Sequence, residues 1–148
     1  MGARASDPLV GFHFSLEVQG AVTGFFTEIG GLGSETEVVD HKIVTPEGHE
    51  VIQKIPGRLK WGEITLKRGV TAEMDMWKWR KLVEDGKISN ARKNGSIVMY
   101  DEALKEIARW NFTNGWPSKI NGPQLQADSN AYGVEELTIV HEGIIRQT

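Results

Sequence analysis

The chain has 148 residues, a mass of 16.5 kDa and a formal net charge of -3, with 39% apolar and 25% charged residues. This length suits one domain with a single core, and this composition excludes wholesale disorder. An acidic chain without long runs of like charge is a poor binder of nucleic acid, and a chain without cysteine has no disulfide and no thiolate metal ligand.

The N-terminus reads Met-Gly-Ala-Arg-Ala-Ser, which satisfies a short acylation pattern. No polybasic patch or second anchor accompanies the pattern, and no apolar run is long enough to cross a bilayer. We therefore expect residues 1–7 to form a flexible leader without a membrane anchor. Because no linker or internal repeat is visible, residues 1–148 are expected to form a single domain.

Apolar side chains alternate with polar ones from Phe12 to Val18, which predicts a half-buried strand over residues 10–19. Small and flexible residues over 20–24 predict a turn. A second strand is expected over residues 25–29, where it ends at two consecutive glycines.

Residues 35–55 predict a long hairpin whose turn is the Thr-Pro-Glu-Gly segment at residues 45–48. The alternation is poor, because the apolar pairs at 38–39 and 43–44 place side chains on both faces. A two-stranded ribbon is only marginally stable by itself in water. We therefore expect a contact from outside this segment to stabilise the hairpin.

Residues 59–70 predict the next strand, whose apolar positions change phase at Gly62, so that a bulge or bend there would restore one buried face. An amphipathic helix follows, with Thr71 as its N-cap and Gly86 as its left-handed cap. Met74 and Trp77 form a second apolar face near the opposite side of this helix, where Trp77 would meet either a loop or another subunit. The apolar stripe expected to pack on the sheet consists of Ala72, Met76, Trp79 and Val83, with Leu82 beside it.

After the helix, the Asn-Gly pair at residues 94–95 introduces a predicted hairpin of residues 96–100 and 107–112. Residues 113–133 are rich in Asn, Gly and Pro and are expected to form a loop, and residues 134–145 a final strand. The predicted fold class is therefore mainly β, with one helix on a mostly antiparallel domain.

The sequence contains no recognisable pattern for catalysis or cofactor binding. Its four histidines lack the spacing of a metal site, and the nearest candidates for catalytic carboxylates, Glu63 and Glu142, lie in strands that alternate with polar positions. The glycines at residues 30–33 are followed by neither a helix nor a Lys-Ser pair, so they predict a bend rather than a phosphate loop. We expect no enzyme, no cofactor and no metal.

Several short segments follow one another at a specific spacing. They are Phe-x-Phe-x-Leu-x-Val at 12–18, Phe-Thr-Glu-Ile-Gly-Gly-Leu at 26–32, Pro-Gly-x-x-Lys-Trp-Gly-Glu-Ile-Thr-Leu-Lys-Arg-Gly at 56–69, the helix with Trp77, Trp-Asn-Phe-x-Asn-Gly-Trp-Pro at 110–117 with Lys119, and Glu-Glu-Leu-Thr-Ile-Val-His-Glu-Gly at 135–143. With these segments the chain resembles, from about Pro8 to Ile145, the tail-tube proteins of contractile phages and of phage-tail-like injection systems.

The resemblance implies a small β-barrel, or two packed antiparallel sheets, flanked by one α-helix. It also implies that copies join in hexameric rings, which stack into a hollow tube inside a contractile sheath and begin at baseplate proteins. Contraction of the sheath would drive the tube through a target envelope, while its lumen conducts a protein effector or phage DNA. Such a particle is assembled in the bacterial cytoplasm.

The resemblance further implies that the hairpin reaches a neighbouring subunit or the next ring, which would account for its missing core. Main-chain pairing and matched charges are expected at these interfaces. The residues expected there are Glu35, Glu37, Asp40 and Glu47 against Lys42, Lys54, Arg58 and Lys60, with Trp77 as a further candidate.

Three alternatives stay open at this point. A tube-initiating paralogue at the baseplate shares the fold, and the secreted ring protein of type VI secretion has the same architecture. In a different class, a monomeric β-sandwich would bind a sugar or peptide on a platform of Trp61, Trp110 and Trp116. The alternating pattern around Trp61 and Trp110 favours core packing over such a platform.

Overall fold

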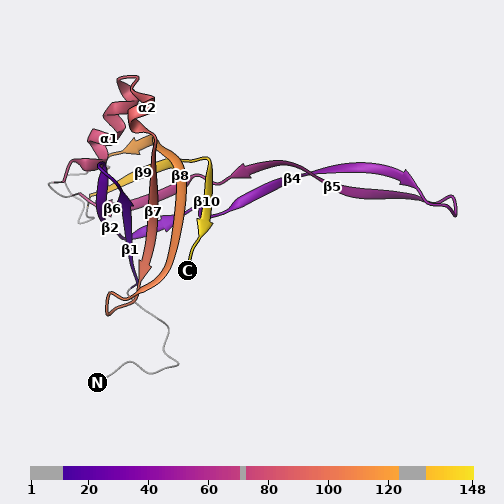
Figure 1. Ribbon diagram of the computed structural model, residues 1–148, viewed down its shortest axis with the longest axis horizontal. Helices are drawn as coiled ribbons and strands as arrows, with labels where there is room; N and C mark the ends of the chain where they lie inside the picture. Colours follow the sequence, from indigo (N-terminus) through magenta and orange to yellow (C-terminus); the bar gives the residue numbers. More distant parts are fainter. Residues whose placement is uncertain (1–11, 71–72, 124–132) are drawn as a thin grey trace, which may run out of the picture.

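The computed structural model describes residues 12–70, 73–123 and 133–148, within which it contains ten strands and two helices (Figure 1). The predicted leader, the predicted helix cap Thr71 and the stripe residue Ala72 lie outside the described residues. The elements are β1 (His13–Val18), β2 (Val22–Phe26), β3 (Glu28–Gly30), β4 (Ser34–Val44), β5 (Glu50–Trp61), β6 (Ile64–Gly69), α1 (Asp75–Glu84), α2 (Ile88–Ala91), β7 (Lys93–Tyr100), β8 (Glu106–Asn121), β9 (Val134–Val140) and β10 (Gly143–Arg146).

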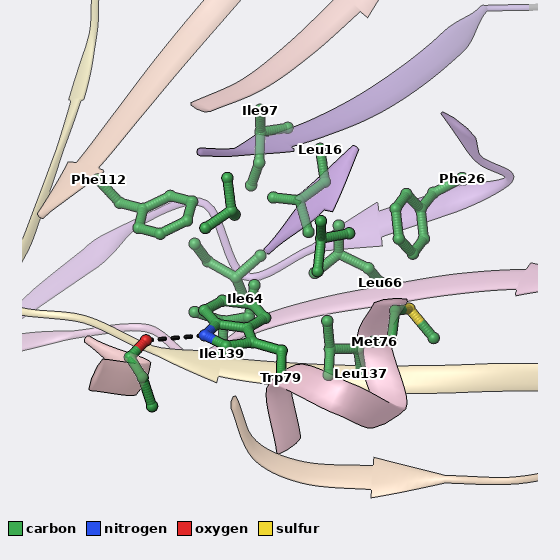
Figure 2. Packing of buried hydrophobic residues seen from close by; sticks show 13 residues of the cluster. Leu16, Phe26, Ile64, Leu66, Met76, Trp79, Ile97, Phe112, Leu137 and Ile139 are labelled. Carbon is green, nitrogen blue, oxygen red and sulfur yellow. Dashed lines mark hydrogen bonds between the residues drawn. The ribbon is translucent and has the colours of Figure 1, made fainter. Parts of the chain in front are cut away.

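One bent antiparallel sheet contains all described strands except β4 and β5. Its order is β2-β1-β7-β8-β9-β6-β3, and β10 pairs with β8. The long strand β8 belongs to both halves of the sheet, because residues 106–115 pair with β7 and residues 116–121 pair with β9. The two halves therefore face each other across a common core (Figure 2).

The described sheet does not close into a barrel, so two packed antiparallel layers describe this chain better than the predicted small barrel. At the open side, the Thr27 N–H donates to the Lys67 carbonyl over 2.8 Å, but β2 and β6 form no ladder. Arg68 of β6 extends toward β2, with its guanidinium 5.3 Å from the centre of the Phe26 ring. A Cβ atom at Gly24 would lie 3.3 Å from Arg68 Nη1. The Arg68 guanidinium thus packs on a residue of β2 at the open side of the sheet.

The core lies between the two layers and is covered at one end by α1 (Figure 2). Trp79 Nε1 donates to the Ala91 carbonyl over 2.7 Å, which ties α1 to α2. Full burial of a large apolar side chain contributes about 1.5–3 kcal/mol, so this cluster is the main source of stability. Its largest members are Leu16, Ile97 and Phe112 from one layer, Ile64, Leu66, Leu137 and Ile139 from the other, and Met76 and Trp79 from α1.

The predicted first strand is confirmed by β1, in which Leu16 and Val18 are buried. The second strand begins at Val22, earlier than predicted, because the Ala21 N–H donates to the Val18 carbonyl over 3.0 Å and reverses the chain there. The predicted strand over residues 25–29 therefore spans the end of β2 and most of β3.

The predicted helix and its buried side are confirmed by α1, where Met76 and Trp79 are buried. The helix begins later than predicted, because its N-cap residue is Met74 rather than Thr71. The helix ends as predicted at Gly86, which has a φ of 79° and donates its N–H to the Val83 carbonyl over 3.0 Å. The prediction of only one helix is wrong, because the chain then forms α2. A helix of one turn is too short to show a periodic apolar stripe in the sequence.

The bend predicted at Gly62 is confirmed, but the prediction of one strand over residues 59–70 is wrong, because Gly62 and Glu63 separate β5 from β6. The Gly62 N–H donates to the Gly33 carbonyl over 2.9 Å, which turns the backbone away from the sheet. Leu59 consequently belongs to a projecting hairpin, where it is 52% exposed, rather than to the core.

The first part of the predicted loop over residues 113–133 is in fact strand, because β8 continues through Pro117 to Asn121. The register of β8 against β9 shifts between Pro117 and Lys119. A proline has no N–H to donate, and a register shift is where a strand tolerates that loss. Residues 124–132 of the predicted loop lie outside the described part of the chain.

The predicted final strand over residues 134–145 is divided into β9 and β10 by His141 and Glu142. Both strands pair antiparallel with β8. Opposite the break, Asn114 has a φ of 49°, and the Glu142 N–H donates to the Thr113 carbonyl over 3.0 Å. A left-handed residue in the partner strand thus interrupts the ladder, which the pattern of residues 134–145 does not reveal.

Candidate subunit interface

The β4–β5 hairpin projects far from the rest of the molecule (Figure 1). Its two strands form a separate two-stranded sheet, and every residue from Ser34 to Val44 is exposed. The predicted turn is confirmed: the Gly48 N–H donates to the Thr45 carbonyl over 2.9 Å, and the Thr45 N–H donates to the His49 carbonyl over 2.8 Å. Both faces of the predicted hairpin are therefore uncovered in the single chain.

One face of the hairpin carries two apolar pairs. Val39 lies opposite Ile55, and Ile43 lies opposite Val51, so these four side chains share a face. Their exposed fractions are 50%, 37%, 36% and 39%, respectively. We call this set the apolar hairpin face.

The other face carries an ion pair and mixed neighbours. Lys54 Nζ lies 2.7 Å from Asp40 Oδ1, and the two residues are direct cross-strand partners. Lys42 lies opposite Ile52 on the same face. Two of the eight charges predicted for the interface thus pair within the hairpin.

The other predicted charges are exposed along the hairpin and make no ion pair with any described residue. Glu35 lies opposite Lys60 near the root, and Glu47 lies in the turn. The ladder shifts register between Thr36 and Val38, next to Gly57. Gly57 approaches the opposite strand closely, since a Cβ there would lie 3.1 Å from Val39 Cγ2. Glu37 and Arg58 lie at this irregularity.

The root of the hairpin is a close contact between backbone segments. Gly31 has a φ of 83°, and a Cβ there would lie 1.8 Å from the Glu63 carbonyl oxygen, so no larger residue fits. His141 Nε2 lies 3.1 Å from the Gly62 carbonyl oxygen, and its ring lies 5.9 Å from the Trp61 ring. Glycine contacts and one histidine therefore hold the hairpin to the sheet.

Trp77 lies on α1, away from the hairpin, and contacts its own chain. Its Nε1 donates to Glu135 Oε1 over 2.9 Å. A Cβ atom at Gly122 would lie 3.7 Å from the Trp77 ring. Of the two predicted environments, these contacts favour the segment after β8; contact with another subunit stays a prediction.

A buried ionic cluster beside Trp77 was not predicted. Arg68 Nη2 lies 2.7 Å from Asp75 Oδ1, and Arg68 Nε lies 3.5 Å from Glu135 Oε2. The sequence signal is a basic pair at residues 67–68 and an acidic pair at residues 135–136. Only the register of β6 against β9 places Arg68 opposite Glu135.

An aromatic patch on the outer face of β1, β2 and β7 was also missed. Phe25 is 59% exposed, and its ring lies 6.5 Å from the His13 ring and 6.0 Å from the Tyr100 ring. Ser15 Oγ donates to Tyr100 Oη over 3.3 Å. Because β2 ends the strand order, this patch borders an open sheet edge.

The three tryptophans of the alternative binding platform lie apart. Trp61 packs against His141, Trp110 lies 5.5 Å below the Arg146 guanidinium, and Trp116 packs against the core. No ring contact joins any two of these tryptophans in the described structure.

The four histidines lie in different parts of the fold: His13 on β1, His41 and His49 on the hairpin, and His141 between β9 and β10. No group of three or more His, Asp or Glu residues is placed to hold a metal ion within residues 12–70, 73–123 and 133–148. Within the same residues, neither helix is long and apolar enough to cross a membrane.

Several solved structures have a similar fold. The anti-feeding prophage cap, a tube-terminating protein, is 22% identical with a TM-score of 0.72, over 100% of this chain and 96% of that one. A chain from the PVC sheath–tube complex in its extended state is also 22% identical with a TM-score of 0.72, over 97% and 94%. Hcp1 from Flavobacterium johnsoniae is 16% identical with a TM-score of 0.54, over 91% and 94%.

No curated protein matches the chain in sequence. The family model described as T4-like virus tail tube protein gp19 matches residues 10–145. This match spans nearly the whole chain and includes the hairpin, its root and both layers of the sheet. The chain therefore belongs to the T4-like virus gp19 family of tail tube proteins.

Proposed function

We propose that copies of this chain join in hexameric rings that stack as the inner tube of a contractile particle, with each hairpin lying on a neighbouring copy. The observation that carries this proposal is the apolar hairpin face, where Val39, Ile43, Val51 and Ile55 are uncovered. Removing apolar surface from water contributes about 25 cal/mol per Å². A second copy supplies such a cover at every position of a symmetric ring.

The open edges of the sheet support the same proposal. β2 and β3 end the strand order, so each presents unpaired main-chain groups in the single chain. Phe25 adds an exposed aromatic ring beside the β2 edge. A ring of copies would pair such edges with one another and remove a surface that otherwise promotes aggregation.

Charges on the hairpin are proposed to determine where the hairpin binds on a neighbouring copy. Because Asp40 and Lys54 pair with each other, they are not the first choice for contacts with a neighbour. The remaining predicted charges have no described ion pair, and we assign them to the contact between copies. They are Glu35, Glu37, Lys42, Glu47, Arg58 and Lys60.

The partners of the tube are proposed from its relatives. Similarity to chains of a sheath–tube complex, of an anti-feeding prophage baseplate and of a tube-terminating cap supports an outer contact with a sheath and end contacts with baseplate or cap proteins. The lumen would conduct a protein effector or phage DNA, after assembly in the bacterial cytoplasm. This role is mechanical and needs no catalytic residue or cofactor.

Negative-stain electron microscopy of the purified chain, with its mass measured on the same sample, tests the proposal. Hollow rings or stacked tubes are expected. The double variant Val39→Asn/Ile55→Asn is expected to fold and to lose assembly, because it makes the apolar hairpin face polar. Leu104→Asn is the matched control: Leu104 is 58% exposed but lies off the hairpin, so this variant is expected to assemble.

Other outcomes would support a different function or contradict the proposal. Single rings that never stack would indicate an initiating or terminating subunit instead of the main tube protein. A chain that stays monomeric even with added baseplate contradicts the proposal. Saturable binding of a glycan or peptide by that monomer would then favour the β-sandwich binding module.

A further inference from the structure

His141 occupies the junction between the hairpin root and the break that separates β9 from β10. The Gly143 N–H donates to His141 Nδ1 over 3.1 Å, so Nδ1 is an acceptor and carries no proton. The ring proton therefore lies on Nε2, which is 3.1 Å from the Gly62 carbonyl oxygen and donates to it. Only the neutral ring, in this one tautomer, makes both hydrogen bonds.

This histidine contacts both the hairpin root and the sheet. Gly62 follows the last residue of β5, and its N–H donates to the carbonyl of Gly33, which precedes β4. The His141 ring also packs between two aromatic rings, with Trp61 of the hairpin at 5.9 Å and Phe112 of the sheet at 6.2 Å. Among the described elements, β4 and β5 pack chiefly on each other, so these root contacts set the direction of the hairpin.

We propose that neutral His141 is a latch that holds the hairpin root to the sheet. Protonation of its ring releases the latch, so that the hairpin can change its direction relative to the sheet. Adding a proton to Nδ1 turns an acceptor into a donor that faces the Gly143 N–H. That hydrogen bond is then lost, and a positive charge is placed in a half-buried aromatic site.

The surroundings of the ring favour its neutral form. Burial lowers the pKa of His141 below its usual 6.5, and the hydrogen bond to the Gly62 carbonyl opposes this shift only in part. The charged residues nearest along the packed segments are Lys60 and Glu63 beside the hairpin root and Glu142 beside the ring. The Glu142 carboxylate accepts from Asn114 Nδ2, and no described residue forms an ion pair with His141.

The direction of the pH effect follows from this lowered pKa. The unfolded chain, with a histidine pKa near 6.5, binds a proton more readily than the folded chain does. The latch is therefore complete above pH 6.5 and weakens as the pH falls through the lower pKa of the folded chain. Each further pH unit below that value leaves about tenfold less neutral ring.

Spin labels on single copies test the latch. The chain contains no cysteine, so Lys42→Cys on the hairpin and Glu84→Cys on α1 provide two unique attachment sites. We expect a narrow distribution of distances between the labels at about pH 7.5 and a broader one at a lower pH, at which NMR shifts show the ring to be protonated. Nitrogen NMR shifts of His141 at about pH 7.5 are expected to show the Nε2–H tautomer.

Substitutions then separate the ring from other titrating groups. His141→Gln keeps an N–H donor for the Gly62 carbonyl and does not titrate, so its distribution is expected to stay narrow at both pH values. His141→Phe removes both hydrogen bonds and is expected to be broad at both. His41→Gln, on the exposed hairpin, is the matched control and should respond to pH as the unsubstituted chain does.

Two results would overturn the latch: the same distribution at both pH values in the unsubstituted chain, or a wild-type response to pH in His141→Gln. The second comparison remains valid if His141→Phe does not fold. Any effect of the latch on tube assembly rests on the proposed function. The spin labels, by contrast, report on dilute single copies and do not depend on assembly. Failure to form tubes at neutral pH therefore bears on the proposed function alone, and an unchanged distance distribution bears on the latch alone.

Discussion

Arg68 and Glu135 face each other across the β6–β9 ladder, where Arg68 Nε lies 3.5 Å from Glu135 Oε2 and both side chains are buried. The same guanidinium lies 2.7 Å from Asp75 Oδ1 in the first turn of α1, and Glu135 accepts from Trp77 Nε1. Arg68 Nε and Glu135 Oε2 make no hydrogen bond within the described structure, so charge rather than hydrogen-bond geometry holds this pair. One arginine thus joins the sheet to the helix.

Replacing Arg68 with methionine is expected to destabilise the chain by about 3–5 kcal/mol, because it leaves the buried Glu135 and the half-buried Asp75 without their cation. Lys67→Met is the matched control, since the Lys67 side chain is 40% exposed and its pair with Glu28 spans 3.8 Å. Its cost is expected to stay below about 1 kcal/mol. Urea unfolding followed by circular dichroism measures both, and equal costs would contradict the structural role of Arg68.

Gly31→Ala is expected to disrupt the hairpin root. Its Cβ would lie 1.8 Å from the Glu63 carbonyl oxygen, and its φ of 83° strains any residue with a side chain. Gly33→Ala is the control, because a Cβ at Gly33 would have no atom of the described structure within 4 Å. That substitution is expected to be neutral or to stabilise by about 0.4–1 kcal/mol. Hydrogen exchange at the root amides, compared between the two variants, checks the difference.

Trp79→Phe is expected to cost about 2–4 kcal/mol, because it leaves a void in the core and removes the donor to the Ala91 carbonyl. Met74→Ala, just before the helix and 58% exposed, is expected to change stability by less than about 0.5 kcal/mol. Thermal unfolding followed by far-ultraviolet circular dichroism distinguishes the two. A small loss for Trp79→Phe would mean that α1 contributes little to the core.

Exchanging the charges of the hairpin pair, as Asp40→Lys/Lys54→Asp, is expected to leave assembly unchanged, because the pair is satisfied inside the hairpin. Lys54→Glu alone places two carboxylates opposite each other and is expected to weaken assembly. Its effect on the stability of the single chain is expected to be small, because an exposed ion pair contributes only about 0–1 kcal/mol to folding. Sedimentation velocity measures the assembled fraction. A double variant as defective as Lys54→Glu would show that one of these charges contacts a neighbouring copy.

Glu47→Lys is expected to weaken assembly without changing the stability of the single chain. Glu47 lies in the exposed turn and makes no ion pair with a described residue, so its charge is assigned to a neighbour. The same sedimentation measurement, repeated at high salt, checks the assignment, because salt screens contacts between exposed charges. Full assembly of Glu47→Lys at low salt would remove Glu47 from the interface.

The spacing of apolar residues predicted the buried side chains correctly wherever one face of a strand or helix meets the core. Alternation placed Leu16 and Val18 inside, and helical spacing did the same for Met76 and Trp79. The pattern failed where a strand changes partner. Pro117 resembles a loop residue but sits at a register shift in β8, a position that pairing with β9 creates.

Residue order and local spacing were enough to predict the mainly β class, the buried helix side, the hairpin with its turn, and the likeness to tail tubes. They could not predict that the sheet stays open beside Arg68, that Arg68 meets Glu135, or that His141 meets the hairpin root. These contacts join residues distant in sequence. Their existence depends on strand register and on how β8 bends, which no local window of sequence contains.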